Sequence, residues 1–125
     1  MLRLLDIFFF AFHTSLIAFV LFGWAWRKTR RAHLIVSGLT LFSWVGLGIW
    51  YGFGYCPCTD WHWHVREQLG ETNLPNSYIK YLLDAVTGWN WNPTFVDVLT
   101  AGAFVLACCA SLWVNFAGRF LRRLK

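Results

Sequence analysis

Two cysteines and two histidines lie within nine consecutive residues, in the stretch CPCTDWHWH at positions 56–64. Thiolates and imidazoles are the ligands that zinc and copper favour, so this stretch supplies a candidate metal site made of Cys56, Cys58, His62 and His64. If the segment is helical, His62 and His64 lie about 200° apart around the helix axis, and only one of them can join the cysteines. An extended segment would place both histidines on one face. The metal interpretation therefore depends on the local backbone.

The same two cysteines could instead form a redox pair. A Cys56–Cys58 disulfide closes a small, strained ring through Pro57, and strained disulfides are labile and oxidising, which suits an exchange catalyst. Cys108 and Cys109 cannot take part, because they lie about 20 Å along an apolar helix from its outer end. The simplest interpretation is structural: Cys56-Pro57 ends the preceding helix, Cys58 follows in the turn, and the neighbouring tryptophans anchor the loop.

His13 is a second candidate, because it interrupts a long apolar run. Counted from Leu4, it lies about 13 Å into a hydrocarbon layer of about 30 Å, where an ionisable side chain is a candidate functional residue. The polar side chains that we expect near it in an intramembrane binding site are Asp97, Thr40 and Ser43. A His13–Asp97 hydrogen bond could hold a neutral imidazole, relay a proton or bind a polar head group. The alternative is a hydrogen bond that only fixes helix packing.

A haem held by both His13 and His33 is excluded, because His33 lies more than about 10 Å away in depth by helical rise. Haem ligation by a single histidine stays an alternative. We predict that the protein has no cofactor, with a bound metal ion or a haem as the alternatives.

The chain that carries these residues is suited to a lipid bilayer. It is 58% hydrophobic and 14% charged, whereas about a quarter of the residues in a soluble protein are charged. Apolar runs at residues 4–26, 34–55 and 95–116 each exceed the roughly 20 residues that cross a membrane. We therefore predict an all-α membrane protein with three transmembrane helices, built as a single membrane domain over residues 1–125.

Basic residues fix the expected orientation. Four lie between the first two spans and four follow the third (Arg27, Lys28, Arg30, Arg31, Arg119, Arg122, Arg123 and Lys125), whereas the loop at 56–92 carries only Arg66 and Lys80. Clusters that border apolar runs set topology, so nucleic acid is not an expected partner. We expect a multi-pass protein of the bacterial inner (cytoplasmic) membrane, with the N-terminus and the 56–92 loop outside and the C-terminus in the cytoplasm.

The 56–92 loop is too long to be structureless, and we predict two short interfacial helices in it that form an extracytoplasmic cap. We expect both helices to lie in the outer interface or to fold over the mouth of the bundle. The first begins with Thr59 or Asp60 as its N-cap and ends at Gly70. Its apolar stripe consists of Trp61, Val65 and Leu69.

The second cap helix begins with Asn76 or Ser77 as its N-cap and ends at Gly88. Lys80 and Asp84 are expected on its wet side. The residues of its apolar face are Tyr78, Ile79, Leu82, Leu83 and Val86.

Four segments carry a resemblance to a known family: LLDIFFFAFHTSLIAFVLFGW, RAHLI, GFGYCPCTDWHW and SYIKYLLD. Through them most of the chain resembles the small bacterial membrane proteins grouped as domain of unknown function 2784, and most closely their Bacteroidetes-type variant. The resemblance implies a membrane fold and location, without a reaction. It also implies that recurrent features of the family correspond to His13, His33, Cys56-Pro57 and Thr59. Three residues depart from the commoner pattern: Cys58, His62 and His64.

These observations favour a structural or accessory role, either as a subunit of a membrane assembly or as a small homo-oligomer, and they favour a non-enzymatic protein. The expected partners are the lipid bilayer and a membrane protein or a second copy of the chain. The alternative is a binding, redox or metal protein with a site between His13, Asp97 and the segment from Cys56 to His64.

Overall fold

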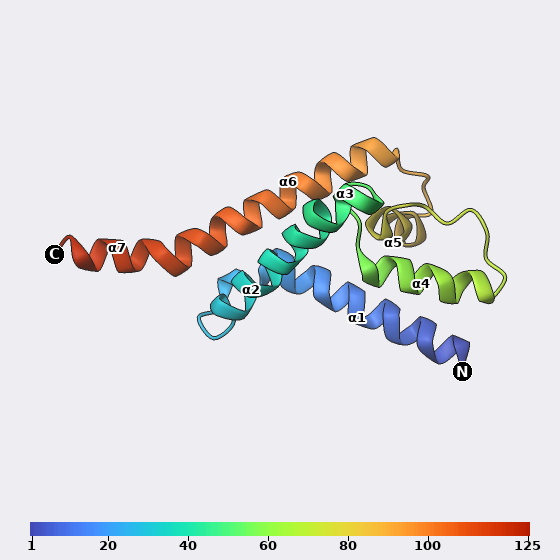
Figure 1. Cartoon of the computed structure of the whole chain (residues 1–125), viewed down its shortest axis with the longest axis horizontal. Coiled ribbons are helices and arrows are strands. Elements are labelled where there is room, and N and C mark those ends of the chain that lie inside the picture. Colours follow the sequence, from blue (N-terminus) through green and yellow to red (C-terminus); the bar gives the residue numbers. More distant parts are fainter. The chain divides into compact units, whose positions relative to one another are not determined.

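Three long helices dominate the computed structural model, which describes all residues from 1 to 125 and contains no strand (Figure 1). They run over Leu2–Ala25, Arg30–Tyr51 and Pro93–Arg123, and each is long and apolar enough to cross a membrane. The predicted all-α class with three candidate spans is confirmed. The second span lies four residues earlier in the chain than predicted, at Arg30–Tyr51, and the third extends into the basic C-terminal cluster.

Each long helix departs from α-helical geometry at one place. The first consists of α1 (Leu2–Phe22) and the 3-10 turn η1 (Gly23–Ala25). The second consists of α2 (Arg30–Leu41), the π-helical turn η2 (Phe42–Leu47) and α3 (Gly48–Tyr51). The third consists of α6 (Pro93–Leu112), the π-helical turn η3 (Trp113–Ala117) and α7 (Gly118–Arg123).

The chain divides into two compact units. The first unit comprises Met1–Thr14 and Cys56–Gly102, and the second comprises Ser15–Tyr55 and Ala103–Lys125. The first unit contains the start of α1, the two cap helices and the start of α6. The second contains the remainder of the three long helices.

Helix α4 (Pro57–Gln68) is the first cap helix, and it begins earlier than predicted. Pro57 occupies its first position, and Cys56 is the N-cap, with extended backbone angles (φ −132°, ψ 118°). The prediction of Thr59 or Asp60 as N-cap is wrong, because proline has no N–H to lose at the first helical position and forces the preceding residue to be extended. The prediction that Cys56-Pro57 ends the second span is wrong for the same reason, since these residues begin a new helix. The predicted stop at Gly70 is confirmed by its positive φ of 95°.

Helix α5 (Tyr78–Thr87) is the second cap helix, and its ends agree with the prediction. Ser77 is the N-cap, and its hydroxyl accepts a hydrogen bond from the Lys80 amide at 3.3 Å. Gly88 closes the helix in the left-handed conformation (φ 73°), and its N–H donates to the carbonyl of Asp84 at 2.9 Å. Both caps satisfy backbone groups that a helix end leaves open.

The faces of the cap helices differ from the prediction at Lys80, whereas Tyr78 of the predicted apolar face of α5 is buried (3% exposed). Trp61, in the predicted apolar stripe of α4, is 58% exposed, whereas His62 is completely buried. On α5, Lys80 is only 8% exposed although it was expected on the wet side, and Val86 of the apolar face is 76% exposed. Paired polar side chains therefore share the interior of this unit with Tyr78 and Val96.

In the second unit, the chain after α3 folds back onto the π-helical turn η2. The Gly54 N–H donates to the Trp44 carbonyl at 3.1 Å, and the Ser43 hydroxyl donates to the Tyr55 carbonyl at 2.7 Å. A π-helical turn disturbs the regular helical ladder, so its carbonyls are available to such partners. The Trp44 ring packs on Phe104 with 4.7 Å between centroids, which fixes the middle of the second span to the third.

His33 forms the polar centre of the second unit. Its ring is fully buried; Nε2–H donates to the Val20 carbonyl at 2.7 Å, and Nδ1 lies 2.9 Å from the Ser111 hydroxyl. Asn115 extends the cluster by donating to the carbonyls of Arg30 and Ser111 at 3.2 and 2.8 Å. Both ring nitrogens of His33 therefore have partners, and these bonds join all three long helices.

Candidate functional site: a thiol and imidazole pair

The first unit brings His13 of α1 against Cys56, the N-cap of α4. Nε2 of His13 lies 3.7 Å from Sγ of Cys56, which is within hydrogen-bonding distance for sulfur. His13 is 5% exposed, so this contact is shielded from water. An imidazole that can donate to a thiolate is a common way to activate a cysteine.

Cys56 has three further features that favour its thiolate. The Cys58 thiol donates a hydrogen bond to its sulfur, and this bond is the largest cause that lowers the pKa of Cys56. The hydrogen bond from His13 and the amide of Thr59 lower it further, against the opposing effect of burial, and the pKa is about 3. The position at a helix N-terminus acts in the same direction, because the helix dipole favours negative charge there.

Cys58 behaves in the opposite way. Its pKa is raised well above the ordinary range, first because its proton is engaged by Cys56 and then because of burial. The two cysteines are both reduced in this structure. One is set up as a thiolate and the other as a thiol, which is the asymmetry expected of an attacking and a resolving cysteine.

Tyr78, the first residue of α5, positions the His13 ring. The two rings stack with 4.2 Å between their centroids, and the Tyr78 and Thr14 hydroxyls are 2.8 Å apart. Burial raises the pKa of Tyr78 above its ordinary value, so its hydroxyl keeps its proton. The imidazole is therefore held by packing on one face and by Cys56 at its edge.

A second set of polar contacts fastens α4 to the start of α1. Nε2–H of His62 donates to Oδ1 of Asp6 at 2.6 Å, and Nη1 of Arg66 donates to the same oxygen at 2.9 Å. Arg66 also pairs with Glu71 and lies over the Tyr81 ring, 4.8 Å from its centroid. We call Asp6, His62 and Arg66 the clamp.

These contacts define how α4 lies along α1. Its N-cap meets His13, whereas its later residues His62 and Arg66 meet Asp6, so the two segments run antiparallel (Figure 1). Helix α4 is thus packed lengthwise on the start of the first span. That this helix lies in the outer interface or over the mouth of the bundle stays a prediction.

Two buried ring nitrogens have no hydrogen-bond partner: Nδ1 of His13 and Nδ1 of His62. For His62, whose Nε2–H donates to Asp6, this leaves Nδ1 as a buried lone pair of a neutral ring. Desolvation lowers the pKa of His62 in spite of its bond to Asp6, in agreement with this tautomer. Unpaired buried nitrogens of this kind are frequent where a group takes part in chemistry.

The structure distributes the other predicted site residues over different places. Asp97 lies on α6 and lines a cavity beside α5, while His13 has Cys56 and Tyr78 as its neighbours. Thr40 and Ser43 belong to the second unit, where Thr40 donates to the Val36 carbonyl and Ser43 to that of Tyr55.

The four predicted metal ligands do not converge. His62 is turned toward Asp6, and the exposed His64 donates from Nδ1 to the Asp60 carbonyl at 2.7 Å. No three His, Cys, Asp or Glu side chains are grouped closely enough to hold a metal ion. The helical spacing argument against a site with both histidines therefore agrees with the structure, and metal or haem binding stays a prediction.

Sequence reasoning missed the roles of Asp6, Arg66 and Tyr78. One available signal was that Asp6 and His13 are seven residues apart and so share one face of α1. The start of α4 also had a signal in the sequence, because proline is typical of the first position of a helix and Pro57 follows Cys56 directly.

The fold and the site define a small all-helical protein with three candidate membrane spans and a half-buried thiol beside a buried imidazole. Residues 3–116 match the family described as Protein of Unknown function (DUF2784), and the chain belongs to this family. The family resemblance is thereby confirmed, whereas the Bacteroidetes-type variant stays a prediction. No curated protein and no solved structure matches the chain.

Proposed function

We propose that this protein is a membrane thiol oxidoreductase in which Cys56 attacks and Cys58 resolves. The observation that carries the proposal is the 3.7 Å contact between His13 Nε2 and Cys56 Sγ at the start of α4, next to the Cys58 thiol. A structural cysteine needs neither a histidine nor a second thiol, and a buried cysteine without such neighbours is inert.

The proposed reaction is exchange with a disulfide of a partner protein. The Cys56 thiolate attacks one sulfur, the substrate S–S bond breaks, and a mixed disulfide forms while the first substrate thiolate leaves. Cys58 then attacks the Cys56 sulfur, and its proton goes to the second departing thiolate. Two electrons pass to the substrate and a Cys56–Cys58 disulfide forms; with a dithiol substrate the same steps run in reverse.

The spacing of the two cysteines permits this disulfide. Residues two apart in the first turn of a helix have Cα atoms about 5.4 Å apart by helix geometry. Disulfides accept Cα separations of roughly 4.4 to 6.8 Å. The strain of the small ring makes the bond easy to reduce, which favours turnover over permanent cross-linking.

The location follows from charge and chemistry together. The basic clusters support an orientation with the N-terminus and α4 outside a bacterial inner membrane, and disulfide chemistry belongs in such an oxidising compartment. A periplasm-active reporter inserted at residues 71–75 should be active. Activity of a cytoplasmic reporter there would overturn the orientation.

The test of the proposed function is capture of the mixed disulfide. Cys58→Ala should accumulate a covalent complex through Cys56 that is released by reductant, whereas Cys56→Ala should accumulate none. Cys108→Ala, which removes another free thiol, on the third helix, is the matched control and should behave like the native protein. If Cys58→Ala traps nothing from the native membrane and does not exchange with a model disulfide, the proposal fails.

A structural or accessory role is the second candidate, supported by one surface of the second unit. One face of the third helix is apolar and consists of Cys109, Leu112, Trp113, Phe116, Ala117 and Phe120. Such a face suits packing against a helix of a partner subunit or of a second copy. This role is favoured if Cys56→Ala leaves the biological function intact while Trp113→Ala releases a co-purifying protein.

A further inference from the structure

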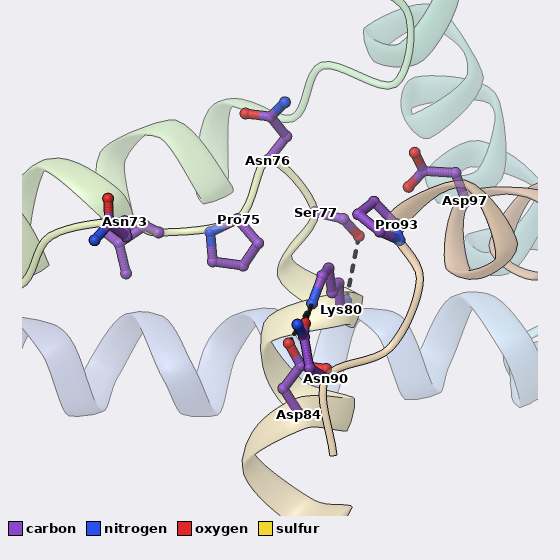
Figure 2. Close-up of a pocket in the computed structure, with 10 residues that line it drawn as sticks. Asn73, Pro75, Asn76, Ser77, Lys80, Asp84, Asn90, Pro93 and Asp97 are labelled. Atoms are coloured by element: carbon purple, nitrogen blue, oxygen red, sulfur yellow. Dashed lines mark hydrogen bonds and ion pairs between the residues drawn. The ribbon is translucent and has the colours of Figure 1, made fainter. Parts of the chain in front are cut away.

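A polar cavity of about 500 Å³ lies in the first unit, away from the cysteines, and it is open to the outside, with Asp97 among its exposed residues (Figure 2). Three segments form its walls: the connection before α5, α5 itself, and the start of α6. The lining residues are Asn73, Leu74, Pro75, Asn76, Ser77, Lys80, Asp84, Asn90, Pro93 and Asp97. Its volume lies in the range of small-molecule sites, about 300 to 1,000 Å³.

Lys80 is the buried cation of the cavity wall. Its Nζ pairs with Asp84 and donates to Oδ1 of Asn90 at 2.9 Å, as the dashed lines in Figure 2 show. The Asp84 carboxylate also accepts from the Trp91 amide at 2.9 Å. An ammonium group has three N–H donors, so one donor of Lys80 is left beyond these two bonds. The wall is therefore preorganised and offers a charged donor.

Asp97 gives the cavity its net charge. Lys80 and Asp84 cancel, and the remaining lining residues are neutral, so the Asp97 carboxylate leaves one negative charge. Figure 2 shows this side chain on the α6 side of the cavity, facing the segment before α5 that holds Asn76 and Ser77. A ligand that fits must carry a cation for Asp97 and oxygen acceptors for Lys80 and the asparagine amides.

The position of the cavity indicates where such a ligand comes from. Pro93 and Asp97 lie in the first turns of a candidate membrane span, at the end where a bilayer presents its head groups. Phosphoethanolamine combines an ammonium group with a phosphate. Quaternary ammonium groups are bound by aromatic rings, and no aromatic residue lines this cavity. A primary ammonium group is therefore the better match.

We propose that this cavity binds the phosphoethanolamine head group of a membrane phospholipid, with Asp97 as the partner of the ammonium group and Lys80 as a partner of the phosphate. The proposal rests on the cavity alone and is independent of the thiol chemistry.

The experiment is native mass spectrometry of the full chain in detergent, with phosphatidylethanolamine, phosphatidylcholine or phosphatidylglycerol added. Phosphatidylethanolamine should bind at least about tenfold more tightly than the other two, and Asp97→Asn should remove about this factor. Asp97→Glu should retain most of the binding. Glu67→Gln, which neutralises an exposed carboxylate of α4 outside the cavity, is the matched control and should bind like the native protein.

Equal binding of the three lipids overturns the proposal, as does native affinity in the Asp97→Asn variant. Thermal unfolding of each variant shows whether a loss of binding reflects a loss of fold; if Asp97→Asn unfolds, the lipid preference of the native protein decides. Displacement of the lipid by soluble phosphoethanolamine at equal concentration would assign the site to a free metabolite and overturn the lipid assignment.

Discussion

His13 and Cys56 are 43 residues apart in the sequence, yet Nε2 of the imidazole lies 3.7 Å from the sulfur. The contact joins a residue inside the first candidate span to the N-cap of a polar helix. Neither residue needs the other for helix formation, so the pairing is a property of the tertiary structure. Through this contact, a histidine of the first candidate span acts on the thiol of a helix-capping cysteine.

Cys56 should titrate as a strongly acidic thiol. Its pKa of about 3 means that its alkylation by iodoacetamide, followed by mass spectrometry, should stay nearly constant from pH 8 to pH 5. His13→Ala removes a stabilising donor and should move the midpoint upward by about one unit for each 1.4 kcal/mol of interaction lost. Cys58→Ala should move it further, because the Cys58 hydrogen bond is the larger cause. A native midpoint near the ordinary value of 9.0 would contradict the assignment.

Loss of the Asp6 charge should weaken the clamp. Asp6→Asn leaves His62 and Arg66, both largely buried, with a poorer acceptor, and we expect a loss of about 1 to 3 kcal/mol in the free energy of unfolding. Denaturant unfolding in detergent, followed by tryptophan fluorescence, measures this loss. The matched change Glu67→Gln on the exposed face of α4 should stay within about 0.5 kcal/mol. Equal effects of both variants would mean that the clamp contributes nothing specific.

The stability of the first unit should fall in acid through His62. Burial lowers the pKa of His62 below 6.5, so the unfolded chain binds the proton more readily than the folded one. The contribution is complete above pH 6.5 and is lost as the pH falls through the folded pKa. The difference in thermal midpoint between native protein and His62→Asn should therefore shrink from pH 7.5 to pH 5.

His64→Asn is the control for this pH dependence, two residues along the same helix. The Asp60 carbonyl raises the pKa of His64, and its side chain is exposed to solvent. Its contribution has the opposite sign, since it is present at low pH and lost as the pH rises, and screening makes it small. A His64→Asn variant that reproduced the His62→Asn behaviour would exclude the clamp as the source. Cys56 also favours the folded state toward high pH, but it is common to all three proteins and cancels in the differences.

The second unit should depend on the bond between His33 and Ser111. Ser111→Ala leaves Nδ1 of the buried His33 with only the longer 3.4 Å contact to Ser37, and we expect a loss of about 0.6 to 2 kcal/mol. Thr40→Val is the matched control, because the Thr40 hydroxyl only donates to the Val36 carbonyl of its own helix. Unfolding in detergent compares the two. A loss for Thr40→Val as large as that for Ser111→Ala would argue against a special role for the cluster.

Local signals made the elements of this fold predictable. Three apolar runs gave the number of candidate spans, and α5 ends at the residues that its cap chemistry indicated, Ser77 and Gly88. The predicted N-cap of α4, Thr59 or Asp60, lies too late in the chain, because Pro57 at the first helical position makes Cys56 the N-cap. The signal was present in the sequence, since proline at the first position and an extended residue before it mark a helix start.

The site itself was only partly predictable. His13, Cys56 and Cys58 were recognised as candidates from their residue types, but their assembly requires α4 to run back along α1. Periodicity identifies an apolar stripe and does not tell whether that stripe meets the protein or the lipid. Lys80 was expected on the wet side of α5, and it is buried because it pairs with Asp84 and Asn90.

The buried polar residues of the cap helices have a consequence for how substitutions will be tolerated. In a complete substitution scan, the outward positions Trp61 and Val86 should accept most hydrophobic replacements, because they need only apolar surroundings and no particular shape. Substitutions should be tolerated least at inward polar positions such as His62 and Lys80, where each replacement leaves a polar partner without its hydrogen bond. In the cap helices, the positions that accept few substitutions should therefore be polar, whereas in a water-soluble helical protein they are mostly apolar.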